Sequence, residues 1–167
     1  MAKHVLQNSD DEIDFALIGL SCSENQYVVA SLIDRTLNIS LRLSDNIPFA
    51  LKDSKLFHFS LYHFLDEEIG LEYFFISNSS NFEALGDMDT SPNAGGSAND
   101  LFAGVEIDES VKLIKELPKT DYFLILKGED LHNYQYKIIH RLKTLPEIIQ
   151  IQAIEPIDLP SRRNLIF

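Results

Sequence analysis

Two runs of apolar residues dominate the hydrophobic pattern of the chain. Ile13 to Leu20 carries a single charge, Asp14, and Tyr122 to Leu126 carries none. A run without a polar face is typical of a strand that is covered on both sides. Each run precedes a segment with the period of an amphipathic helix. We therefore expect these two strands, each followed by a helix, to form the centre of the fold.

Three helices are predicted from apolar positions that recur every three to four residues. The first runs from about Asn25 to Asn38, and the second from about Glu129 to Lys143. A shorter helix is predicted from Asp108 to Leu117, where Pro118 would stop it. The apolar stripes of the two main helices are Val29, Leu32, Ile33, Thr36 and Leu37, and Leu131, Tyr134, Ile138, Ile139 and Leu142.

Further strands are predicted at residues 39–43, 56–64, 71–77 and 148–154. Residues 66–70 form a polar turn of hairpin length between the two aromatic-rich strands, and 45–54 reads as a loop that contains Pro48. The resulting order is β-α-β-β-β-(short α)-β-α-β. It predicts an α+β fold: a mixed, mainly antiparallel sheet of about six strands with two main helices on one face.

One folded domain is expected, because 167 residues with 45% hydrophobic content suffice for a single sizeable core. We predict a flexible N-terminal arm at 1–12, a single α+β domain at 13–160 and a C-terminal tail at 161–167. Within the domain, a disordered loop is predicted at about 78–104. Its small polar residues cannot bury enough apolar surface to offset the entropy of ordering.

The net charge of -12 makes the surface acidic and argues against binding to nucleic acid or to anionic membranes. Another protein is the expected partner, and a homodimer is an open alternative. Cys22 is the only cysteine, so no intrachain disulfide can form, which favours a reducing compartment. The first residues are polar and acidic, unlike a signal peptide, and no apolar run reaches the ~20 residues of a membrane helix. A cytoplasmic location is therefore predicted.

Several short motifs occur in one order along the chain: DFALIGLS at 14–21, DYFLILKG at 121–128, LPE at 145–147 and RNLIF at 163–167. Together they resemble the IPExxxVDY family, a small bacterial family of unknown function. Leu145-Pro146-Glu147 matches the start of the naming motif, whereas Ile151-Gln152-Ala153 stands where Val-Asp-Tyr would be expected. The resemblance implies no activity, cofactor or catalytic residue.

Candidate chemistry is sparse, and we predict no catalytic, cofactor-binding or metal-binding residues. The five histidines lack the spacing of a chelate, and no phosphate-binding loop or nucleophile elbow occurs. Cys22 follows the first apolar run at a strand-to-helix turn, so it is either a reactive thiol or a small half-buried apolar residue. Asp14 and Asp121 open the two apolar runs, where each is expected to accept a backbone amide or to pair with a base such as Arg141.

The chain ends with an apolar segment behind two arginines. Such a tail either adds an edge strand to its own sheet or binds another protein by strand addition. The candidate protein-contact residues are Arg162, Arg163, Asn164, Leu165, Ile166 and Phe167. The predicted function is that of a non-catalytic protein-binding or adaptor module, acting through this tail or an exposed sheet edge. The alternative, by analogy of fold alone, is a small-molecule-binding regulatory domain.

Overall fold

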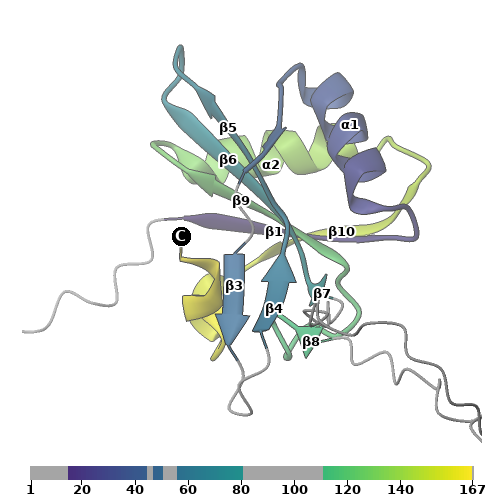
Figure 1. Ribbon diagram of the computed structural model, residues 1–167. Helices are drawn as coiled ribbons and strands as arrows, with labels where there is room; N and C mark the ends of the chain where they lie inside the picture. The colour runs from purple at the N-terminus through teal and green to yellow at the C-terminus, as the bar shows by residue number, and fades with distance from the viewer. Residues whose placement is uncertain (1–14, 45–46, 51–55, 81–110, 167) are drawn as a thin grey trace, which may run out of the picture.

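The computed structural model describes residues 15–44, 47–50, 56–80 and 111–166, with the backbone alone for 47–50 and Leu56. In this part of the chain, six strands form one sheet (Figure 1). Their spatial order is β10 (Ile148–Ile154), β1 (Ala16–Cys22), β9 (Tyr122–Lys127), β6 (Leu71–Ser77), β5 (Leu61–Asp66) and β2 (Arg42–Leu43). All neighbouring strands in it are antiparallel. The predicted α+β fold with about six strands is confirmed.

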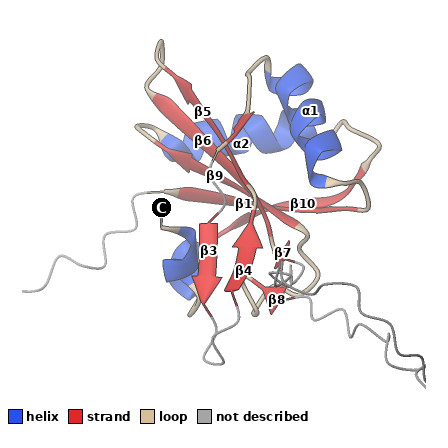
Figure 2. Ribbon diagram, in the orientation of Figure 1, coloured by secondary structure: helices blue, strands red, loops and turns tan. Residues whose placement is uncertain are grey.

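Two helices of twelve residues cover one face of this sheet: α1 (Gln26–Leu37) after β1, and α2 (Leu131–Leu142) after β9 (Figure 2). Each helix connects two strands that run in the same direction. β1 lies between β9 and β10 and is antiparallel to both, while β9, β6 and β5 lie between β1 and β2. The two predicted β-α-β units are therefore present, but the strands within each unit are not neighbours.

Apolar residues of β9 alternate between the two faces of the sheet. Tyr122, Leu124 and Leu126 point into the core under the helices, and Phe123 and Ile125 point to the opposite core. All five are buried. The helix-side core is completed by buried residues of α1, α2, β1 and β6: Val29, Ala30, Ile33, Leu37, Ile138, Leu142, Ile18, Leu20, Leu71 and Phe75.

Among the described residues, a second layer of short elements covers the opposite face. A hairpin of β3 (Ile47–Ala50) and β4 (Leu56–Phe59) forms part of it. A further short pair, β7 (Ser79–Ser80) and β8 (Val111–Lys112), lies beside β4. The buried side chains that these segments and the C-terminus contribute are Phe57, Phe59, Leu113, Ile114, Leu159 and Leu165. Because both faces are covered, the continuous apolar run of β9 has no solvent-facing side.

Gly128 ends β9 at a point where the chain passes close to the β5–β6 turn. Its φ of +145° is one that residues with a side chain rarely adopt. A Cβ at this position would lie 2.7 Å from the carbonyl oxygen of Gly70. Glycine is therefore required here both by the backbone conformation and by the contact.

Asn78 follows β6 and organises the second layer. Its side chain is fully buried; the oxygen accepts from the Ile114 N–H at 2.8 Å, and the nitrogen donates to the carbonyls of Leu117 and Thr120, each at 2.9 Å. Its backbone carbonyl accepts from the N–H of Leu113, also at 2.8 Å. One asparagine therefore satisfies backbone groups along most of the segment 113–120.

The predicted short helix at Asp108–Leu117 is wrong in its described part, residues 111–117. Val111 and Lys112 form β8, and the residues after them form turns. The spacing of Val111, Ile114 and Leu117 fits a helix, but the hydrogen bonds of this segment go to Asn78 instead. Asp108 lies outside the described residues.

Two further expectations need correction between α1 and β6. Residues 47–50, predicted as part of a loop, form β3, and Pro48 is tolerated there because it lies on an edge of a two-stranded hairpin. The strand predicted at 56–64 breaks at Ser60 into β4 and β5. The Ser60 carbonyl accepts a hydrogen bond from the Gln26 side chain at 2.8 Å, so the start of α1 holds this break.

The predicted disordered loop at about 78–104 begins with residues that the structure does describe. Asn78 is buried, and Ser79 and Ser80 pair with Lys112 and Val111 as β7. The prediction is therefore wrong for residues 78–80. The remainder, 81–104, lies outside the described residues, as does the predicted arm at 1–12.

Replacing Asn78 with alanine tests its role in the second layer. We expect Asn78→Ala to lower the free energy of unfolding by about 3 kcal/mol, because several buried backbone groups lose their partner at once. Urea unfolding monitored by circular dichroism measures the change. Asn133→Ala is the matched control, since the exposed side chain of Asn133 bonds only to the Asp130 carboxylate in the described contacts, and we expect a loss of at most about 0.5 kcal/mol. Equal losses in the two variants would contradict the assignment.

Candidate functional site

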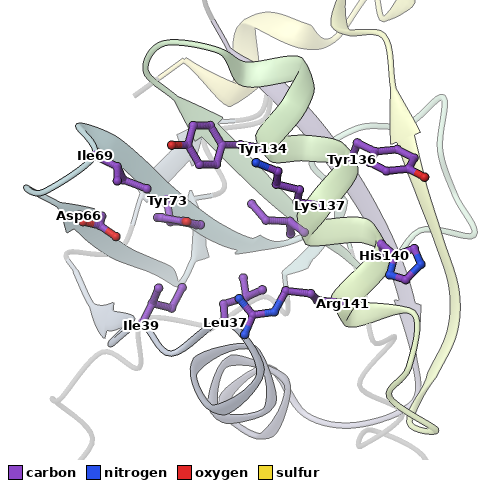
Figure 3. Close-up of a pocket in the computed structure, with 11 residues that line it drawn as sticks. Leu37, Ile39, Asp66, Ile69, Tyr73, Tyr134, Tyr136, Lys137, His140 and Arg141 are labelled. Carbon is purple, nitrogen blue, oxygen red and sulfur yellow. The ribbon is translucent and has the colours of Figure 1, made fainter.

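One candidate site in the described residues is an open pocket of about 580 Å³ on the helix-covered face. It lies between the end of α1, the β5–β6 turn and α2 (Figure 3). Leu37, Ile39, Ile69 and Ile138 supply apolar lining. Three of these four residues come from elements other than α2, so the fold assembles the pocket from distant parts of the sequence.

α2 gives the pocket most of its polar groups, and three of them lie on one flank of the helix. Tyr134, Lys137 and Arg141 recur at i, i+3 and i+7, so they share a side of the helix. The Lys137 ammonium lies 5.7 Å from the centre of the Tyr134 ring, within range of a cation–π contact. The Arg141 guanidinium donates a hydrogen bond to the Thr36 carbonyl and so connects α2 to the end of α1. Tyr136 and His140 also line the pocket, on the side of α2 away from Ile69 (Figure 3).

Tyr73 of β6 places a buried phenol in the pocket wall. Its pKa is raised mainly by burial, and further by Asp66 and Tyr134, while Arg141 acts in the opposite direction. The phenol therefore keeps its proton at neutral pH, where it can donate one hydrogen bond and accept another. It stands between the carboxylate of Asp66 at the turn and the guanidinium of Arg141 on α2 (Figure 3).

The charge of the pocket lining differs in sign from that of the whole chain. Lys137 and Arg141 contribute two positive charges and Asp66 one negative charge, which leaves +1 with His140 neutral. The complete chain carries -12. An apolar cavity with phenols and an excess of positive charge suits a small molecule that combines an apolar body with an anionic group.

The turn around Cys22 is a structural corner. Asp121 accepts a hydrogen bond from the Cys22 backbone N–H at 2.9 Å, which confirms that Asp121 accepts a backbone amide. The thiol is buried, and burial raises its pKa, with carboxylates of Glu24, Asp121 and Glu147 adding to the effect. The thiol therefore holds its proton at neutral pH. Of the two alternatives for Cys22, the geometry favours the buried apolar residue.

Tyr122 closes the same corner. Its hydroxyl donates to the Glu24 carbonyl at 2.5 Å, and burial, aided by nearby Cys22, Asp121 and Glu24, raises its pKa to about 12. Asp14, for which the sequence predicts the same role as for Asp121, lies outside the described residues. Within the described part of the chain, no three histidine, cysteine, aspartate or glutamate side chains gather closely enough to hold a metal ion.

The tail residues are folded onto the second layer, and Arg162–Leu165 form a 3₁₀ helix instead of the predicted edge strand. Leu165 is 0% exposed, and the Asn164 side chain donates to the Leu113 carbonyl at 2.8 Å. Arg162 donates to the Ile157 carbonyl at 3.1 Å. Arg163 is exposed and Ile166 is 64% exposed, so a contact with another protein stays a prediction for these two. Phe167 lies outside the described residues.

No family model matches the chain, and neither a curated protein nor a solved structure matches it. The resemblance to the IPExxxVDY family therefore stays a prediction. Neither α1 nor α2, the two α-helices of the described residues, is long and apolar enough to cross a membrane.

The sequence predicts other roles for the pocket residues. Tyr134 and Ile138 were expected in the apolar stripe of α2, and the polar turn that contains Asp66 and Ile69 only as a hairpin connection. The periodic signal that marks Tyr134, Lys137 and Arg141 as one flank is present in the sequence. The sequence does not indicate that the β5–β6 turn lies opposite this flank.

Two neighbouring tail residues test whether the tail belongs to the core. We expect Leu165→Ala to reduce the free energy of unfolding by about 2–5 kcal/mol, because it leaves a cavity under the sheet. Ile166→Ala, one residue further on and mostly exposed, should change it by no more than about 0.5 kcal/mol. Chemical denaturation of both variants gives the comparison. A Leu165→Ala protein as stable as the parent would show that the tail is dispensable for folding.

Proposed function

We propose that the protein is a non-catalytic, small-molecule-binding regulatory module whose ligand occupies the pocket beside α2. The observation that carries the proposal is the combination of a cavity of about 580 Å³, four apolar lining residues and polar groups of seven others, two of them cationic. Ligand sites typically have volumes of about 300–1,000 Å³ and this kind of lining. The single cysteine supports a cytoplasmic location as part of the same proposal.

The polar groups of the pocket support binding in preference to chemistry. Tyr73 stays protonated, and the Arg141 guanidinium is held on the Thr36 carbonyl. Cys22, the one thiol of the chain, does not line the pocket, and no serine or threonine among the described residues does. Fixed donors around an apolar cavity can orient a ligand without forming a bond to it.

Two cationic side chains in the pocket indicate the class of ligand. Lys137 and Arg141 lie one turn apart on the pocket flank of α2, and each offers donors to a carboxylate or a phosphate. The apolar side chains below them accommodate an aliphatic or aromatic body. A small amphipathic anion satisfies both parts of the lining, whereas a fully polar anion would leave the apolar part in contact with water.

A pair of probes of equal shape tests this assignment: 4-phenylbutyrate and its neutral alcohol, 4-phenylbutanol. We expect the carboxylate to raise the melting temperature in a concentration-dependent way, because a ligand bound only by the native state stabilises it. Lys137→Gln and Arg141→Gln should each weaken carboxylate binding about tenfold, which is the loss of one charge-assisted hydrogen bond, and leave binding of the alcohol unchanged. Isothermal titration calorimetry measures both ligands.

Lys143→Gln is the matched control for these variants, since Lys143 is an exposed lysine directly after α2 that does not line the pocket. It should bind both probes like the parent protein. Failure of the carboxylate to bind at all, or an equal loss of affinity in Lys143→Gln, would refute the assignment of the pocket.

Protein binding at a sheet edge is the second candidate function. The observation that favours it is β10, an edge strand with an exposed, uncharged surface. The tail is the weaker candidate for such a contact, because Leu165 and Asn164 are already engaged within the fold.

A further inference from the structure

The two edges of the main sheet differ in the features that prevent strands from pairing with other chains. At one edge, β2 has only two residues and includes Arg42. At the other edge, β10 extends over seven residues, IIQIQAI, with no charge and no proline. Short length and charge are common protections of an edge strand, and β10 has neither.

β10 carries one irregularity, at its beginning. Its register with β1 slips between Ser21 and Cys22, so Ile149 has no partner on β1 and bulges outward, 73% exposed. From Gln150 to Ile154 the pairing with β1 is regular. Five consecutive residues therefore present a regular row of backbone groups on the outer side, where no strand of the described chain pairs with them.

Exposed apolar side chains accompany this edge. Ile149 lies at one end of β10, and Ile157, 59% exposed, follows the other end. Tyr136 is 68% exposed on α2, the helix that packs against β10. These side chains widen the uncharged surface beyond the strand itself, in a chain whose net charge is -12.

We propose that β10 pairs with β10 of a second copy of this chain across a two-fold axis, which joins two six-stranded sheets into one. The proposal does not rest on the ligand pocket. A second copy fits because the regular segment is self-complementary when it is paired antiparallel about its central residue, Gln152. Gln152 then faces Gln152 of the second copy, and the two amides can each donate and accept.

The same register suits the other residues of the segment. Ile151 faces Ala153 of the second copy on the helix-covered side, and Gln150 faces Ile154 of the second copy on the other side. No carboxylate lies within these five pairs, so two acidic chains can approach here without placing like charges opposite each other. A five-residue pairing with a few apolar side chains is a small interface, and reversible association is therefore expected.

Charge placed at the two-fold axis tests the register. Gln152 is exposed, so Gln152→Glu and Gln152→Lys should both fold normally. The dissociation constant of the parent dimer, measured by sedimentation equilibrium, should lie between about 1 μM and about 1 mM, the range of weak complexes. Each variant alone should associate about tenfold or more weakly, because like charges face each other. An equimolar mixture of the two should recover the dimer through the opposite charges.

Ser31→Glu, on the exposed side of α1, adds the same charge away from β10 and should leave the dimer unchanged. A parent protein that stays monomeric at the highest concentration overturns the proposal. Hydrogen exchange then separates the alternatives: protected outward amides of β10 would mean that another segment of this chain covers the edge, and rapid exchange would mean that the edge stays open. A dimer that neither substitution weakens would also overturn it, because its interface would lie elsewhere.

Discussion

The fold depends on one constraint: β1 and β9 pair with each other in the interior of the sheet, and the apolar side chains of both point alternately to its two faces. A strand of this kind is stable only when both faces are covered. α1 and α2 cover one face. The other is covered by the β3–β4 hairpin, the segment held by Asn78 and the C-terminal 3₁₀ helix. The tail is thus part of the layer that buries the sheet.

Both proposed binding surfaces lie where the helix layer or the sheet comes to an end. Two helices of twelve residues cannot cover a six-stranded sheet completely, and the pocket lies where the end of α1, α2 and the β5–β6 turn leave space between them. The sheet itself ends at β10 without a charged or shortened edge. α2 takes part in both surfaces, because it lines the pocket with Lys137 and Arg141 and packs against β10.

Local patterns in the sequence were sufficient for the elements that carry their own period. The two main helices, β9, β6 and β10 were predicted within a few residues, because the periods of 3.6 and 2 are visible in the side chains themselves. The region 111–117 was misread as helical because its hydrogen-bonding partner, Asn78, lies more than thirty residues earlier. Likewise, Asp66, Tyr73 and Arg141 meet only after folding, so the pocket had no signature in the sequence. The position of β10 at an edge is also a property of the topology.

Native-state hydrogen exchange of β1 and β9 tests the central constraint most directly. If both faces of these strands are sealed, the hydrogen-bonded amides of Ile18 and Leu124 can exchange only when the whole domain unfolds. Their exchange free energies should then equal the free energy of unfolding from denaturant titration and should decrease with denaturant at the same slope. Exchange at a clearly lower free energy, with little dependence on denaturant, would show that one layer opens independently and would contradict a sheet sealed on both faces.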